Sequence, residues 1–110
     1  METITLKGIA AAPDKFGRFR FLITDEWELR QAIPWSRTQS VPYVIQPDND
    51  TIGVFWVTMH NVSDAQKRLW TAEVEQLRGA RVTVTCKKRT FRFQNKMGTA
   101  LDFIKIEKNQ

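Results

Sequence analysis

Cationic and aromatic side chains are interleaved in three short stretches of the chain, at residues 16–21, 87–93 and 101–105. Lys and Arg side chains bind phosphates through charge, and aromatic rings offer flat faces on which unpaired bases stack. This pairing of residue types is suited to a polyanion that carries planar groups. The side chains that need only charge and reach for this role are Arg18, Arg20, Lys87, Lys88, Arg89, Arg92, Lys96 and Lys105.

One aromatic residue falls on the same side of a predicted strand as a cation. Strict alternation over residues 100–106 places Phe103 with Lys105, on the face opposite Ile104 and Ile106. We therefore add Phe103 to the candidate nucleic-acid-binding residues, with packing in the core as the alternative.

Three further aromatic residues belong to a segment that no regular pattern explains. Residues 25–50 contain three prolines and the turn-forming run Asp48-Asn49-Asp50, so we predict a long connection there, with an edge strand at residues 41–45. The aromatic side chains of this segment are candidates for base stacking or for contact with a protein partner, and loop packing is the alternative. They are Trp27, Trp35 and Tyr43.

Positive charge is concentrated in the last third of the chain. Residues 1–77 hold 8 Lys or Arg against 10 Asp or Glu, a net charge of −2, whereas residues 78–110 hold 9 against 2, a net charge of +7. Such a basic block is typical of a surface that binds phosphates, and a solvated hairpin that keeps the protein soluble is the alternative.

The sequence offers little material for catalysis. It has one histidine, His60, and one cysteine, Cys86, so it lacks a metal-spaced set of ligands and a serine or cysteine triad, and it has no glycine-rich phosphate loop. We predict no catalytic residues, no metal, no cofactor and no enzymatic activity. The acidic cluster of Asp25, Glu26 and Glu28 is interpreted as part of a solvated loop.

The length and hydropathy of the chain favour a single cytoplasmic domain spanning residues 1–110. A chain of 110 residues is long enough for one hydrophobic core. No apolar run approaches the roughly 20 residues that a membrane helix needs, and the first residues do not have the pattern of a secretory signal. We therefore expect no membrane association.

Alternation and capping signals predict a mainly β fold with one helix. Strands are expected at residues 3–9, 15–24, 52–59, 80–93 and 100–106, with Gly8 marking a bulge or bend. In the fourth strand, Val82, Val84 and Cys86 should face the core. Ser63 and Gln66 form a capping-box pattern that opens a helix. Its predicted apolar stripe is Leu69, Trp70, Val74 and Leu77.

The order of these elements resembles the OB-fold, a five-stranded, partly open Greek-key barrel, because the helix falls between the third and fourth strands. The resemblance implies that strands two and three bind single-stranded nucleic acid or sugars, together with the loops joining strands one to two and four to five. In this chain those loops are residues 11–16 and 94–99.

Two functions follow as hypotheses. The first is non-enzymatic binding of single-stranded DNA or RNA, with little sequence preference, through a basic face and some base stacking. The alternative is a protein-interaction module, such as a small inhibitor or replication accessory factor, that docks an acidic partner or self-associates through an open sheet edge. An exposed cluster of Trp27, Trp35 and Tyr43 would favour the second.

Overall fold

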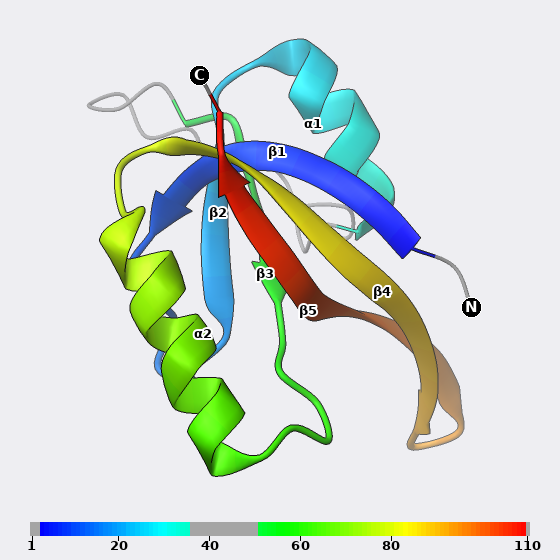
Figure 1. Ribbon diagram of the computed structural model, residues 1–110. Helices are drawn as coiled ribbons and strands as arrows, with labels where there is room; N and C mark the ends of the chain where they lie inside the picture. Colours follow the sequence, from blue (N-terminus) through cyan, green and yellow to red (C-terminus); the bar gives the residue numbers. More distant parts are fainter. Residues whose placement is uncertain (1–2, 36–50, 110) are drawn as a thin grey trace.

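The computed structural model describes residues 3–35 and 51–109, in which five strands and two α-helices are found (Figure 1). A 3₁₀ turn, Ile33–Trp35, follows the first helix. The strands and helices are β1 Thr3–Ala11, β2 Phe19–Ile23, α1 Glu26–Ala32, β3 Gly53–Val57, α2 Asp64–Gln76, β4 Arg81–Phe93 and β5 Lys96–Lys108.

The five strands form one sheet in the order β3-β2-β1-β4-β5, with every named pair antiparallel. The two edges of this sheet meet at one point, where Thr58, just after β3, makes a parallel bridge with Asp102 of β5. There the Thr58 amide donates to the Leu101 carbonyl and the Phe103 amide donates to the Thr58 carbonyl, both at 2.8 Å. A single bridge curls the sheet without closing it into a barrel. The prediction of a mainly β fold is confirmed.

Strand β1 curves across the molecule because it pairs with two neighbours (Figure 1). Its first part pairs with β4 and its last residues pair with β2. A Cβ at Gly8 of β1 would fall 2.9 Å from the Leu22 carbonyl oxygen. The register runs through Gly8 without a shift, so this glycine permits close approach of the backbones and does not mark a bulge.

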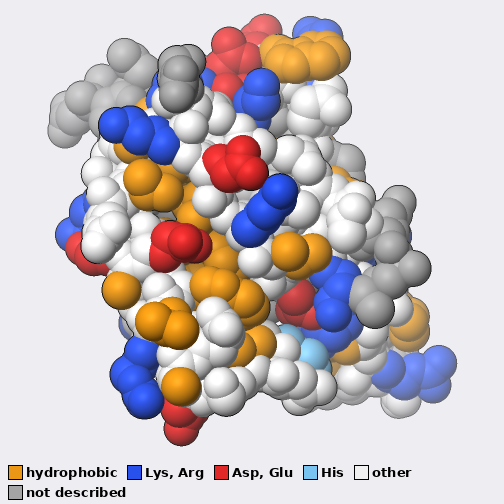
Figure 2. All heavy atoms as spheres, viewed as in Figure 1, with side chains coloured by type: hydrophobic (Ala, Val, Ile, Leu, Met, Phe, Trp, Pro, Cys, Tyr) orange, Lys and Arg blue, Asp and Glu red, His pale blue; other side chains and the backbone are white. Residues whose placement is uncertain are grey.

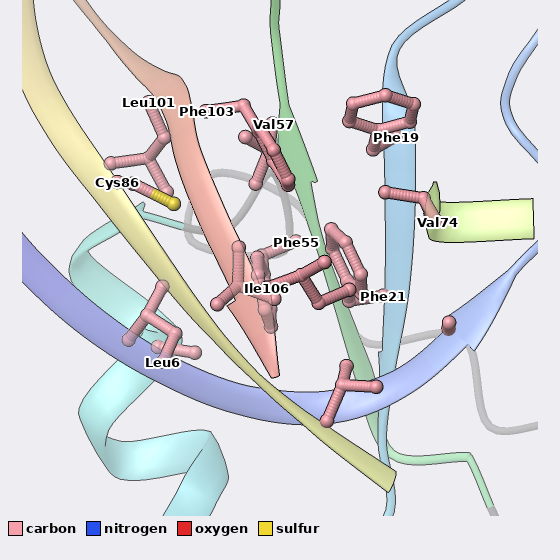
Figure 3. Close-up of a cluster of buried hydrophobic side chains, with 14 of the residues drawn as sticks. Leu6, Phe19, Phe21, Phe55, Val57, Val74, Cys86, Leu101, Phe103 and Ile106 are labelled. Carbon is pink, nitrogen blue, oxygen red and sulfur yellow. The ribbon is translucent and has the colours of Figure 1, made fainter. Parts of the chain in front are cut away.

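The predicted alternation in β4 is confirmed. Val82, Val84 and Cys86 are fully buried, whereas Arg81 is exposed. These side chains pack with aromatic residues of β2 and β3 in the core that Figure 3 shows. The core includes the rings of Phe21 and Phe55, which stack with centroids 5.1 Å apart.

Helix α2 begins as its capping signal predicts. Ser63 is the N-cap, and its hydroxyl accepts a hydrogen bond from the Gln66 amide. Past the end of the helix, Gly79 has a φ of 85°, a conformation that favours glycine. The predicted apolar stripe needs one correction, because Leu69 is 66 % exposed. Val74 is buried, and Trp70 and Leu77 pack partly against the core.

The segment between β2 and β3 contains a helix that the sequence analysis missed. Asp25 is the N-cap of α1, and its carboxylate accepts a hydrogen bond from the Glu28 amide at 3.0 Å. The acidic cluster therefore begins a helix instead of lying in a solvated loop, and the helix stops before Pro34 as the residue type requires. The predicted edge strand at residues 41–45 lies outside the described residues.

The face assigned to Phe103 was wrong. Thr85 pairs with Lys105 and Cys86 pairs with Phe103, so Ile104 forms a β-bulge that has no partner in β4. The extra residue reverses the alternation, and Phe103 shares the core face with Cys86. It is 4 % exposed, and its ring meets those of Phe19 and Trp70 edge to face at 5.2 and 5.0 Å (Figure 3). A ring in this position has no free face for a base.

The hairpin between β4 and β5 projects beyond the rest of the sheet (Figure 1). Gln94 and Asn95 form its turn, and both have positive φ angles, 49° and 63°. This pattern is typical of the tight turns that match the twist of a hairpin. The turn lies at the start of the loop predicted at residues 94–99.

Neither α1 nor α2 has the length and apolar character that a transmembrane helix requires, and residues 3–35 and 51–109 contain no other α-helix.

Candidate nucleic-acid interface

The turn between β1 and β2 is organised by one carboxylate. Oδ1 of Asp14 accepts hydrogen bonds from the amides of Phe16 and Arg18, each at 2.9 Å, and Oδ2 accepts one from the Arg18 Nε at 2.6 Å. Burial opposes ionisation of this carboxyl, but the hydrogen bonds and the charge of Arg18 outweigh it and lower the pKa of Asp14. The turn therefore holds the Arg18 guanidinium in a fixed place at the start of β2.

The Arg18 guanidinium lies close to two aromatic rings. Its central carbon is 5.5 Å from the ring centroid of Phe16 and 5.8 Å from that of Trp56. Phe16 is 72 % exposed, and the Lys15 ammonium approaches its centroid to 5.1 Å. Both distances from Arg18 lie within the range of cation–π interactions, so β2 and β3 present a joint cationic and aromatic surface here.

A second arginine is held at the junction between β3 and β5. Nε of Arg89 donates to Oδ2 of Asp102 at 2.8 Å, and Nη2 donates to Oδ1 at 3.3 Å. Oδ1 also accepts a hydrogen bond of 2.7 Å from the Thr58 hydroxyl. Asp102 is 6 % exposed, so its charge is compensated by Arg89 and Thr58 in a nearly dry environment.

The Phe91 ring packs over Gly98 on the hairpin. A Cβ at Gly98, its partner in β5, would fall 2.5 Å from the Phe91 Cζ, so only glycine leaves room for the ring to lie across the neighbouring strand. The central carbon of Arg89 is 5.6 Å from the centroid of this ring. The hairpin thus repeats the pairing of arginine and aromatic ring seen at Arg18.

These parts meet around one open groove of about 310 Å³. Its walls come from the 3₁₀ turn, the start of β2, the end of β3 and both strands of the hairpin. Two arginines and three aromatic rings line it together. The residues that define the groove are Arg18, Trp35, Trp56, Thr58, Arg89, Phe91, Thr99, Ala100 and Leu101.

The predicted site residues fall into two groups. Arg18, Arg89 and Trp35 line the groove, and the Lys88 ammonium lies 5.1 Å from the Trp35 centroid. Trp27 lies elsewhere: it is 68 % exposed on α1. Tyr43 is outside the described residues. Trp27 and Trp35 therefore do not line the same groove, and a cluster that also includes Tyr43 is not tested by the described residues.

The other predicted cations surround the groove or lie apart from it. Arg92 and Lys96 are exposed near the hairpin turn, and neither forms an ion pair with any residue in the described ranges. Arg20 pairs with Trp56 across β2 and β3. Lys87 pairs with the buried Asp102.

Lys105 lies away from the groove. It pairs with Thr85 on the far side of the bulge and forms an exposed ion pair with Glu107 at 3.3 Å.

Figure 2 shows basic and hydrophobic side chains together at its lower right, where Figure 1 places the hairpin.

Several of the residues that build the groove were not predicted as site residues from the sequence. Trp56 lies in the predicted strand at residues 52–59, where Phe55 and Val57 point into the core and Trp56, half-buried, points to the other face. Strict alternation would have shown this. Asp102 carried a weaker signal, as one of two acidic residues in the basic block.

The burial of Cys86 in the core predicts low reactivity of its thiol. Burial, reinforced by the negative charge of Asp102, raises the pKa of the Cys86 thiol to about 12. The reactive thiolate is therefore scarce at neutral pH, and the sulfur is also shielded. We expect iodoacetamide at pH 8 to leave the native protein unlabelled in mass spectrometry and to label it in denaturant. Rapid labelling of the native protein would contradict this burial.

Neither a group of metal ligands in the described residues nor a similar known protein defines the site further. Within residues 3–35 and 51–109, no three His, Cys, Asp or Glu side chains are grouped so that they could hold a metal ion. No protein-family model matches this chain, and no curated protein or solved structure proved similar to it.

Proposed function

We propose that the chain binds single-stranded DNA or RNA, without enzymatic activity and with little sequence preference. The observation that carries this proposal is the groove, in which two arginines and three aromatic rings from four segments of the chain face one space. Aromatic rings stack with any base, because every base has a π face, and each stacked base contributes roughly 1–3 kcal/mol.

We infer an OB-like architecture, and this inference supports the proposal. The strand order β3-β2-β1-β4-β5, the bridge between Thr58 and Asp102, and the position of α2 between β3 and β4 fit a partly open barrel of this type. In such barrels strands two and three and the loop between strands four and five bind oligonucleotides. The groove lies against those elements, and α1 with its 3₁₀ turn is an addition between β2 and β3.

The hairpin supplies charge for the phosphates. Arg92 and Lys96 are exposed, close to the turn, and continuous with the strands that line the groove. A strand whose bases occupy the groove would carry its backbone past them. Each phosphate that these side chains neutralise releases condensed counterions, which makes the affinity depend on salt.

Removing two hairpin cations should weaken that dependence. With Arg92→Ala combined with Lys96→Ala, we expect the slope of log affinity against log salt to become about 1.4 less negative on a single strand, or roughly 0.7 per lost contact. Fluorescence anisotropy at several salt concentrations measures the slope, and a melting curve confirms that the fold is retained.

A matched control removes the same charge from α2. Lys67→Ala combined with Arg68→Ala should leave the slope as in the unmodified protein, because neither side chain lies near the hairpin or the groove. Equal effects of the two double variants would mean that net charge, and not the hairpin, governs binding. No effect of either would favour a solubility role for the basic block.

A protein-interaction module remains the second candidate, and one observation favours it. The Trp27 side chain is 68 % exposed on α1, away from the groove. Aromatic side chains of this kind are enriched where proteins bind proteins. A chain that bound neither single-stranded DNA nor RNA at low salt would make this candidate the better one.

A further inference from the structure

The two arginines of the groove are already paired with acidic residues. Arg18 is held by Asp14 and Arg89 by Asp102, with closest N–O distances of 2.6 and 2.8 Å. Resting on the proposed function, we infer that the groove is a site for an unpaired nucleobase. Arg18 and Arg89 serve there as flat, charge-compensated stacking surfaces, and the phosphates are bound outside the groove by the cations of the hairpin.

The ion pairs argue against phosphate binding at these two guanidiniums. The side chain of Asp102 is only 8 % exposed, so this carboxylate is largely removed from water, whereas Asp14 is half-buried in the surface turn. A phosphate that took Arg89 from Asp102 would leave a buried carboxylate uncompensated, which is among the costlier changes in a protein interior. A phosphate that joined the pair would instead meet the repulsion of a nearby negative charge.

The same pairs leave the faces of the guanidiniums available for stacking. A guanidinium donates its N–H bonds in its own plane, so the carboxylates bind its edge and not its faces. The central carbon of Arg18 lies 5.5 and 5.8 Å from the ring centroids of Phe16 and Trp56, and that of Arg89 lies 5.6 Å from the centroid of Phe91. A guanidinium is weakly hydrated and stacks well on π systems. Aspartate pairing therefore fixes each arginine in the orientation that a planar ligand requires.

The size and lining of the groove fit such a ligand. A space of about 310 Å³ lies at the lower end of the range for small-ligand sites. Aromatic rings supply much of its wall, and the hydroxyl-bearing Thr58 and Thr99 border it. By contrast, Arg92 and Lys96 lack a carboxylate partner among the described residues and remain available to phosphates.

The first test uses the unmodified protein and two labelled probes. One probe is an oligothymidylate of about 12 nucleotides, within the usual range of site sizes, and the other is an abasic strand of the same length. We expect the abasic strand to bind at least about tenfold more weakly, because stacking is lost, with the same salt slope, because the phosphate contacts are kept. Equal affinity for the two strands would overturn the inference.

Two variants test the role assigned to the arginines. Arg89→Lys keeps the charge and removes the planar face, so it should reduce the preference for the intact strand over the abasic strand about tenfold and leave the salt slope unchanged. Asp102→Asn frees the charge of Arg89, so the salt slope should become steeper by about 0.7. Melting curves establish that each variant is folded, and Arg18→Lys gives the same test if Arg89→Lys is not.

The outcomes separate this inference from the proposed function. Unchanged preference in a folded Arg89→Lys or Arg18→Lys variant, or a flatter salt slope, would show that the arginine binds phosphate or nothing, while single-strand binding would stand. Failure of the unmodified protein to bind either probe at low salt would instead remove the proposed function, and this inference with it.

Discussion

Phe103→Ala is expected to destabilise the protein by about 3–5 kcal/mol. The Phe103 ring lies in the core between Phe19 of β2 and Trp70 of α2, and it joins the sheet to the helix at the point where β3 meets β5. Truncation would leave a cavity that three elements cannot easily collapse to fill. Chemical denaturation followed by circular dichroism measures the loss.

The neighbouring residue gives a matched control. Ile104 is the bulged residue and is 37 % exposed, so Ile104→Ala should cost no more than about 1 kcal/mol. Strict alternation makes the opposite prediction, with Ile104 in the core and Phe103 on the surface. A larger loss for Ile104→Ala than for Phe103→Ala would therefore show that the bulge is absent.

Trp56→Ala is expected to weaken binding of a single strand by roughly 5- to 150-fold, the loss that corresponds to one stacked base. Trp56 lines the groove from β3, and its ring lies beside the Arg18 guanidinium. The side chain is on the face opposite Phe55 and Val57, so the core stays intact without it. Anisotropy with a labelled oligothymidylate measures the change.

Trp27→Ala is the control for that experiment. It removes a tryptophan of the same size from α1, where the ring is exposed and is not part of the groove. We expect its affinity to equal that of the unmodified protein. Loss of binding in Trp27→Ala with none in Trp56→Ala would place the contact surface on α1 and refute the site described above.

Alternating patterns predicted most of the sheet because burial on one face imposes a period of two. Val82, Val84 and Cys86 obey that rule in the first half of β4. The rule fails at Ile104, because a bulge inserts one residue without leaving any mark in residue type. Lys105 and Ile106 after the bulge keep their predicted faces, exposed and buried, whereas Phe103 before it lies on the face opposite to the predicted one. Only pairing with β4 reveals the bulge.

The helix α1 escaped prediction because proline dominated the interpretation of its surroundings. Asp25 followed three residues later by Glu28 is a capping signal, yet the helix has 7 residues, too few for a clear periodic pattern. The 3₁₀ turn that follows α1 carries Trp35 into the groove, so the missed helix explains the position of one groove residue.

The groove itself could be predicted only in part. Charge and residue type indicated Arg18 and Arg89, since these need no tertiary information. The contact between Thr58 and Asp102 could not be predicted in the same way. The two residues are 44 positions apart in the sequence and meet only through the bridge between β3 and β5. Sites assembled from distant strands depend on a topology that residue types do not specify.

Direct titration of the unmodified protein tests the central proposal. A labelled oligothymidylate and a duplex of equal length are each titrated with protein, and the dissociation constants are followed as salt increases. We predict tighter binding of the single strand than of the duplex, with log affinity falling linearly with log salt. Equal binding of both, or no binding of the single strand at low salt, would contradict the proposed function.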